Sequence, residues 1–166
     1  MSFQLPKLLK NFDLKVNGVS QGGRILEFTP PSITPTIMQV KAGRILPLSV
    51  IAGFDSNFKA SIVMAEYSTI LQSLVGLDIP SIFIANGAVN DDGSTSYTSA
   101  TVVMQGLVSY TPATWKPGSM AKDKYDLTLS FFQYVGAGSI TMYADGHMYL
   151  VNGIDIIERI KNKIKM

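Results

Sequence analysis

Cysteine is absent from this chain of 166 residues, which excludes a disulfide framework and any site that depends on a thiolate. Histidine occurs once, at His147, so a catalytic triad or a histidine-based metal centre would lack its usual partners. We interpret His147 as a surface residue beside the predicted turn at Asp145-Gly146. Charge is also scarce, because charged residues make up 16% of the chain, against about 25% in ordinary soluble domains. This deficit indicates either a large β core or a surface that other subunits cover.

The remaining candidates for chemistry lack the spacing that their chemistry requires. Asp91 and Asp92 are adjacent carboxylates of the kind that bind a divalent cation, but the rest of a ligand set is missing, and we interpret them as a solvated turn. The glycines at 18, 22 and 23 are not followed by the Gly-Lys-Ser/Thr of a phosphate-binding loop. The formal net charge of +2 is too small to indicate a nucleic-acid binder. We therefore predict no catalytic, metal or cofactor site.

Alternating apolar and polar residues, separated by turn signals, predict a chain built mainly of antiparallel strands. Asn17-Gly18 is a strong turn signal because both residues tolerate positive φ, and Asp91-Asp92-Gly93 predicts a second hairpin. The segment KYDLTLSFFQY is a long alternating strand, and shorter strands follow it. Strands are predicted at residues 11–16, 24–29, 36–41, 57–64, 82–89, 97–110, 124–134, 139–144 and 148–151.

Two helices are predicted. Residues 65–75 repeat apolar side chains at helical spacing, and Gly76 is a natural C-terminal stop. The second helix is predicted to begin at Gly153, with Asn152 as its N-cap and Asp155 near its positive end. Its final lysines could contact nucleic acid, but aromatic residues are not interleaved with them, and the helix macrodipole already accounts for cations there. The apolar stripe of the internal helix comprises Tyr67, Ile70, Leu71, Leu74 and Val75.

Two apolar features stand apart from this regular pattern. Residues 43–54 read GRILPLSVIAGF, with almost no charge after Arg44. Since an exposed loop is normally polar, this segment is either a buried strand or an arm that docks on a neighbouring chain. The loop predicted at 111–121 contains the only tryptophan, Trp115, which anchors either an interface or the loop itself.

Together these elements predict a mainly β (α+β) fold in a single domain, residues 1–166. The expected architecture is an antiparallel β-barrel or sandwich with one packed internal helix and a short C-terminal helix. The uncharged windows 93–115 and 127–144 do not indicate membrane spans, because serine, threonine and glycine are scattered through both. No membrane insertion by this chain is therefore expected.

Several short segments, taken in order, resemble one known family. They are LPKLLK at 5–10, DDG at 91–93 followed by VVMQG at 102–106, YDLTL at 125–129, and VNGID at 151–155 before a basic end. In this order and spacing the chain resembles the major tail tube protein of contractile-tailed bacteriophages, a family that also supplies the tubes of R-type bacteriocins. The resemblance runs nearly from end to end.

The resemblance implies a structural protein whose six-subunit rings stack into a hollow tube, with strands of all subunits joined in one inner barrel. An N-terminal arm, residues 2–11, and an extended loop, residues 43–54, would bridge subunits or rings. The implied partners are further copies of the chain, the tail sheath, the baseplate or initiator, and the tape-measure protein, with DNA passing through the lumen in a phage. The implied inter-subunit residues are Leu5, Leu8, Leu9, Arg44, Ile45, Leu46, Leu48, Val50, Ile51 and Phe54. The implied sheath-facing residues are Glu158, Arg159, Lys161 and Lys163.

Other functions stay open at the level of the sequence. The related tube of a type VI secretion system would share the architecture, and a monomeric β-barrel that binds a ligand or partner would show one small species in solution. An enzyme is disfavoured by the single histidine and the missing catalytic spacing. If the chain forms a tube for DNA, a strongly basic lumen would bind phosphates and stall passage. We therefore expect polar or acidic lumen strands, with the lysines mostly outside, in a virion tail assembled in the host cytoplasm.

Overall fold

The computed structural model describes residues 7–32, 34–41, 43, 46–54, 57–91, 97–136, 139–145 and 149–155. These residues form mostly antiparallel sheet, which confirms the mainly β class. The helix among them is α1 (Thr69–Leu74). The strands are β1 (Lys7–Val16), β2 (Val19–Ser20), β3 (Ile25–Thr29), β4 (Pro35–Val40), β5 (Leu48–Phe54), β6 (Lys59–Met64), β7 (Ser81–Asp91), β8 (Tyr97–Thr111), β9 (Asp123–Gly136), β10 (Ser139–Ala144), β11 (Tyr149–Val151) and β12 (Ile154–Asp155).

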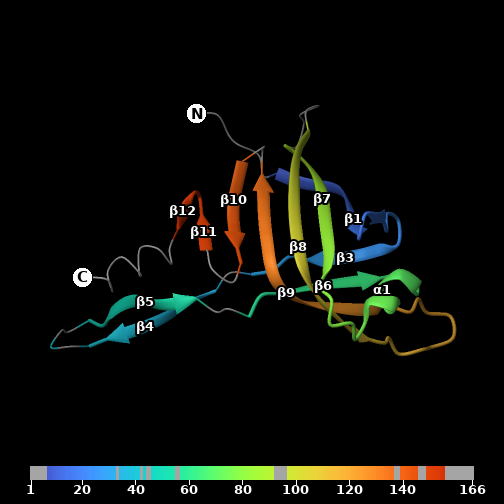
Figure 1. The fold of residues 1–166 in the computed structure, drawn as a ribbon, viewed down its shortest axis with the longest axis horizontal. Helices are drawn as coiled ribbons and strands as arrows, with labels where there is room; N and C mark the ends of the chain where they lie inside the picture. The colour runs from blue at the N-terminus through green and yellow to red at the C-terminus, as the bar shows by residue number, and fades with distance from the viewer. Residues whose placement is uncertain are drawn as a thin grey trace.

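One ten-stranded sheet makes up most of the fold. Its main order is β12-β11-β10-β9-β8-β7-β1-β2, and β6 pairs with both β9 and β3. In Figure 1, β7, β8, β10 and the upper part of β9 run upright, whereas β3, β6 and the start of β9 run across beneath them. Among the described residues the terminal strands β12 and β2 do not pair with each other. Within the described part of the chain the sheet therefore bends over itself but stays open, which leaves edge strands that other chains can pair with.

The bend is organised by β9, which changes partners along its length. Its first half lies between β6 and β8, and its second half lies between β8 and β10. An extra residue, Ser130, interrupts the pairing with β8 and reverses the alternation, so that Leu129 is buried before it and Phe132 after it. Gly106 lies opposite this bulge, and a Cβ there would be 2.3 Å from the carbonyl oxygen of Thr128. The absence of a side chain at Gly106 thus allows β8 and β9 to approach at the bulge.

The hydrophobic core fills the space enclosed by the bent sheet and α1. The packing includes edge-to-face contact between Phe58 and Phe132, whose ring centroids are 4.9 Å apart. Burial raises the pKa of Tyr125 to about 12, since an ionised phenolate in the core would lose its hydration. The largest fully buried apolar side chains are Tyr125, Phe83, Phe132, Leu14, Ile62, Met64, Leu71, Met104 and Leu127.

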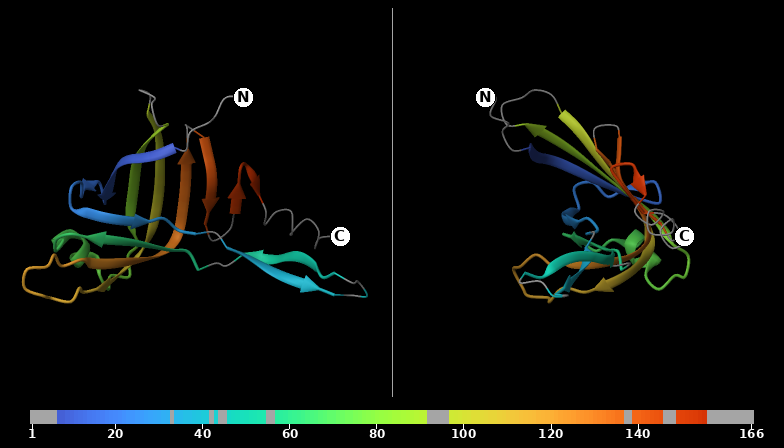
Figure 2. Two further views of the ribbon diagram at one scale, coloured as in Figure 1. Left: turned by 180° about the vertical axis from the view of Figure 1, so that it is seen from behind. Right: turned by 90° about the vertical axis from the view of Figure 1, so that its left-hand side faces the viewer.

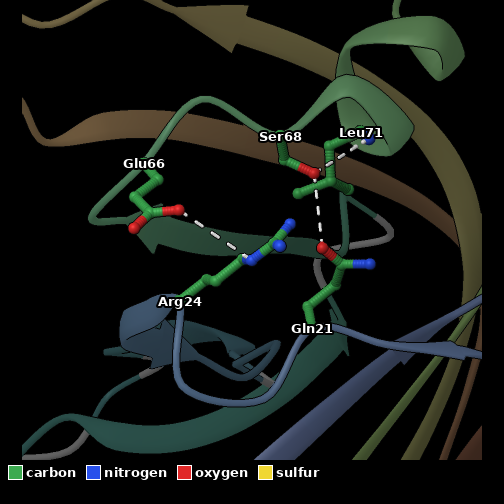
Figure 3. Close-up of polar contacts among 5 residues, drawn as sticks. All are labelled: Gln21, Arg24, Glu66, Ser68 and Leu71. Carbon is green, nitrogen blue, oxygen red and sulfur yellow. Dashed lines mark hydrogen bonds and ion pairs between the residues drawn. The ribbon is translucent and has the colours of Figure 1, made fainter.

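The start of α1 is fixed by a buried polar contact (Figure 3). Ser68 Oγ accepts a hydrogen bond from the Leu71 N–H at 3.3 Å and donates one to Gln21 Oε1 at 3.4 Å. Ser68 and Gln21 are both buried, so the contact ties the helix N-cap to the segment between β2 and β3. Arg24 and Glu66 form an ion pair nearby at 3.9 Å, but both side chains are exposed and the pair adds little stability.

The helix has six residues and is shorter than the predicted 65–75. Its N-cap at Ser68 leaves Tyr67 outside the helix and exposed, so the prediction that Tyr67 belongs to the core stripe is wrong. At the other end Val75 is already extended and forms an isolated bridge with Val108. Gly76 has a φ of 78°, as expected of a residue that ends a helix.

The prediction that a C-terminal helix begins at Gly153 is wrong. Asn152 and Gly153 have φ values of 51° and 79°, and Val151 pairs with Ile154 across them. Two successive left-handed residues make a tight hairpin turn, whereas a helix N-cap has extended backbone. Residues 156–166 lie outside the described residues, so the rest of that prediction stays untested.

The N-terminal predictions also need one correction. The Asn17-Gly18 turn is confirmed, with φ values of 48° and 85°. Residues 7–11, expected in the arm, instead continue β1, which pairs with β7 from Lys7 to Val16. Pairing with β7 engages the backbone groups on one side of these residues inside this chain. The arm stays a prediction for residues 2–6, which lie outside the described residues.

Candidate functional site

The β4–β5 hairpin stands apart from the rest of the fold. The two strands form their own two-stranded sheet, separate from the ten-stranded one. Figures 1 and 2 show this hairpin projecting beyond the main sheet at one end of the molecule. The segment 43–54, expected to be a buried strand or an extended loop, is thus a strand from Leu48 onward in an exposed hairpin.

One face of this hairpin consists of apolar side chains. The register pairs Met38 with Val50 and Val40 with Leu48. Residues two apart in a strand share a face, so these four side chains lie together, and all four are exposed. We call them the hairpin apolar face. The opposite face carries Ile37, Gln39 and Ser49.

An apolar face of this kind indicates a contact surface. An isolated two-stranded hairpin is marginally stable in water, and an exposed apolar patch typically marks an interaction site. Neither strand contains a charged residue that would keep the face hydrated or repel another chain. Leu46, which precedes β5, is 78% exposed and extends the same apolar region of the sequence.

The structure brings together some of the predicted inter-subunit residues and separates others. Leu48 and Val50 lie in the hairpin and Leu46 directly precedes β5, and their role at an inter-subunit contact stays a prediction. Leu9 lies elsewhere, on β1, where it lines an apolar cleft of about 170 Å³ with Phe12, Phe28 and Tyr134 among others. The backbones of Leu8, Ile51 and Phe54 lie in strands, but their side chains are outside the described part of the chain. Leu5, Arg44, Ile45, Glu158, Arg159, Lys161 and Lys163 are also outside it.

Sequence reasoning missed half of the hairpin apolar face. Met38 and Val40 come from β4, which was predicted as a strand but not as part of a contact surface. A signal was present, since β4 begins at Pro35 and reads PTIMQV without a charge. What the sequence did not provide was the pairing of this strand with β5 outside the main sheet.

The upright strands carry a second surface, on the face opposite the core. Asn86 pairs with Thr101, and Thr101 Oγ1 donates a 2.9 Å hydrogen bond to Asn86 Oδ1. Val103 pairs with Gln133 and with Ile84 on its other side. These residues, with Gln105 and Val135, are uncharged and partly exposed. On β7, β8 and β9 these residues of the face are uncharged, and on the adjoining strand β1 Asp13 pairs with Asn86 and Lys15 with Ile84. The two opposite charges leave no excess of positive charge to attract phosphate groups.

Neither surface resembles a catalytic or metal centre. Among the described residues, no group of histidine, aspartate and glutamate side chains is placed to hold a metal ion. His147 and Asp92, and the side chain of Asp91, fall outside the described part of the chain. In the same part of the chain, no helix is long and apolar enough to cross a membrane.

The family profile described as phage tail tube protein FII matches residues 6–164. The chain belongs to this family. The recognition made from sequence segments is therefore confirmed at the level of a phage tail tube protein. No match is found among curated proteins.

Membership of the tail tube family gives the chain a structural role in the virion tail. Tail tube proteins assemble with copies of themselves into a tube and work together with other tail components. The exposed hairpin and the open sheet edges are features that such assembly can use. The tail tube family is a family of structural proteins.

Proposed function

We propose that this chain is the tube subunit of a contractile tail, and that six copies form a ring whose repeats stack into a hollow tube. The observation that carries the proposal is the hairpin apolar face, which the chain leaves exposed. Removing such a face from water is favourable by about 25 cal/mol for each Å² of apolar area, which supplies a driving force for assembly. The open sheet edges supply backbone donors and acceptors for pairing between subunits.

The proposed lumen lining is the neutral face of β7, β8 and β9. Its uncharged residues, such as Asn86, Thr101 and Gln133, would neither bind DNA phosphates nor strongly repel them. A tube of this kind conducts DNA in a phage, or serves as a rigid puncturing element in a particle without DNA. The proposed partners are the sheath around the tube, the baseplate or initiator below it and the tape-measure protein within it, with assembly in the host cytoplasm.

The test of this function changes the charge of one hairpin face at a time. In the variant Leu48→Asp/Val50→Asp, two carboxylates replace apolar groups of the hairpin apolar face. We expect a folded subunit that forms no rings or tubes in electron micrographs, because burial of unpaired carboxylates opposes docking. The matched control is Gln39→Asp/Ser49→Asp, which adds the same charge to the opposite face and is expected to retain tubes.

A coarser version of the test removes residues 44–53. This deletion is expected to leave a folded subunit that no longer polymerises, as judged by circular dichroism and electron microscopy. Unfolding of the deletion variant, or normal tubes from the Leu48→Asp/Val50→Asp variant, would contradict the role of the hairpin as an assembly arm.

A further inference from the structure

Three asparagines in the chain are followed directly by glycine, namely Asn17, Asn86 and Asn152. This dipeptide allows a reaction within the chain, because glycine has no side chain to hinder approach to its backbone nitrogen. After that nitrogen loses its proton to the solvent, it forms a bond to the asparagine Cγ. The Cγ–Nδ2 bond then breaks, and the leaving nitrogen takes a proton from the solvent and departs as ammonia. Water opens the resulting succinimide ring at either carbonyl and yields aspartate or isoaspartate, so water is the only co-reactant.

Asn86 is restrained by both neighbouring strands. It lies in β7, where it pairs with Asp13 of β1 and with Thr101 of β8. Its Oδ1 accepts a 2.9 Å hydrogen bond from Thr101 Oγ1. Gly87, which would supply the attacking nitrogen, belongs to the same two ladders. Ring closure at Asn86 would require the centre of the sheet to open, which is among the costliest openings in a fold.

Asn17 lies in an exposed turn, but its side chain is also restrained. Its N–H donates to the Ile82 carbonyl oxygen at 2.9 Å, and its Oδ1 accepts a hydrogen bond from the Ile82 N–H at 3.0 Å. The turn between β1 and β2 is thereby tied to the start of β7. Ring closure requires the Asn17 Cγ to swing toward the Gly18 nitrogen, and this movement breaks the bond to Oδ1. The restraint therefore slows the reaction at Asn17.

Asn152 is exposed in the turn between β11 and β12 and lacks such a restraint. The described part of the chain gives its side chain no hydrogen-bond partner of the kind that holds the other two asparagines. The strands β11 and β12 are joined by two residue pairs, and β12 is the last strand of the sheet, as Figure 1 shows. So short a hairpin at a sheet edge opens at low cost, which lets the Asn152 Cγ meet the Gly153 nitrogen.

We propose that Asn152 is a deamidation site of the folded chain, converting to aspartate and isoaspartate severalfold faster than Asn17 or Asn86. The reaction takes place in a single subunit, so the inference does not depend on the proposed function. Both products add a carboxylate close to Asp155. Isoaspartate also adds one carbon to the main chain inside a two-residue turn, so the pairing across it cannot be kept. The isoaspartate product therefore releases β12 from the edge of the sheet.

The test follows the dispersed, unmodified protein in mildly alkaline buffer, which promotes loss of the glycine N–H proton. Peptide mapping by mass spectrometry measures the conversion of amide to carboxylate at each asparagine, and enzymatic methylation distinguishes isoaspartate from aspartate. We expect conversion at Asn152 to be severalfold faster than at Asn17 or Asn86. In concentrated urea the three rates should converge, because the restraints are lost. Conversion at Asn17 or Asn86 as fast as at Asn152 in the folded protein, or no conversion at Asn152, would overturn the proposal.

The matched variants are Asn152→Gln and Asn17→Gln. Ring closure from the longer glutamine side chain is slower, so aged Asn152→Gln should stay unconverted at this turn. Aged Asn17→Gln should convert at Asn152 at the rate of the unmodified chain. A folded protein that accumulates the same amount of isoaspartate in Asn152→Gln would place the reaction elsewhere and overturn the assignment.

A second readout rests on the proposed function, which uses the open edges of the sheet. Protein aged until Asn152 is mostly isoaspartate should form severalfold fewer tubes in electron micrographs than fresh protein. The variant Asn152→Gln should form as many tubes after ageing as before. Equal tube formation by aged and fresh unmodified protein would contradict the release of β12. Absence of tubes from fresh protein would overturn the proposed function and leave the deamidation site standing.

Discussion

Replacement of Gly106 by alanine should lower the free energy of unfolding by more than a glycine-to-alanine change usually does. A Cβ at this position would lie 2.3 Å from the Thr128 carbonyl oxygen, 2.9 Å from the Thr128 carbonyl carbon and 3.0 Å from the Leu129 Cα. All three are backbone atoms of β9 beside the bulge at Ser130, so no side-chain rotation can relieve the contact. The variant Gly106→Ala must therefore separate β8 from β9 or remove the bulge.

The expected loss follows from this geometry. Overpacking of a well-packed interior typically costs about 1–3 kcal/mol, and contact with backbone puts Gly106→Ala at the upper end, about 3 kcal/mol. In a chain of this size each kcal/mol lowers Tm by about 2–4 °C, so Tm should fall by roughly 6–12 °C. Thermal and urea unfolding, followed by circular dichroism at a concentration where the subunit is dispersed, measures both quantities.

The matched control is Gly87→Ala in the neighbouring strand β7. There the nearest atom to a new Cβ is Leu9 Cδ1 at 2.8 Å, the end of an exposed side chain that can change rotamer. We expect this variant to change the free energy of unfolding by less than about 1 kcal/mol, partly because alanine restricts the unfolded chain. Equal stability losses in Gly87→Ala and Gly106→Ala would refute the argument that backbone contact at the bulge sets the penalty.

Two further variants test the helix cap and the core tyrosine. Ser68→Ala removes the acceptor of the Leu71 N–H and the donor to Gln21 Oε1, so the free energy of unfolding should fall by about 1–2 kcal/mol. The control Ser73→Ala, at an exposed helix position, should change the free energy of unfolding by less than about 0.5 kcal/mol. Burial raises the pKa of Tyr125 from 10.0 to about 12. As pH rises, the unfolded chain therefore loses the Tyr125 proton before the folded chain does. The contribution of Tyr125 to stability is thus complete below pH 10 and is lost as pH rises toward 12. Between pH 10 and 12 the free energy of unfolding should therefore fall less steeply with pH in Tyr125→Phe than in the unmodified protein. Identical slopes in the two proteins would contradict the raised pKa of Tyr125.

Local patterns were sufficient to predict most strands but not how they pair. Alternation in 124–134 located β9, and Asn17-Gly18 located the first turn. The change of partner along β9 depends on β6, a strand distant in sequence, and on an extra residue at Ser130. Neither leaves a local signature, because alternation on both sides of a bulge looks regular when each half is read separately.

The two helix errors share a cause. At Asn152-Gly153 the same dipeptide that correctly predicted a hairpin at residues 17–18 was interpreted as a helix cap, because acidic and basic residues follow in helical order. At Tyr67 the helical spacing was correct, but the side chain of Ser68 caps the backbone one residue later. In both places a backbone turn set by one or two residues overrides the longer periodic pattern.

The candidate contact surfaces were predictable in kind but not in extent. A charge-poor chain with an apolar segment at 43–54 indicated coverage by other subunits. Only the register of β4 and β5 establishes that Met38, Val40, Leu48 and Val50 lie on a single face.

The central claim is that this chain assembles with itself into a hollow tube. Electron microscopy of the purified, unmodified protein over a wide range of concentrations tests it most directly. The account predicts rings with six-fold symmetry that stack into long hollow tubes at high concentration. A dispersed monomer at every concentration would contradict it.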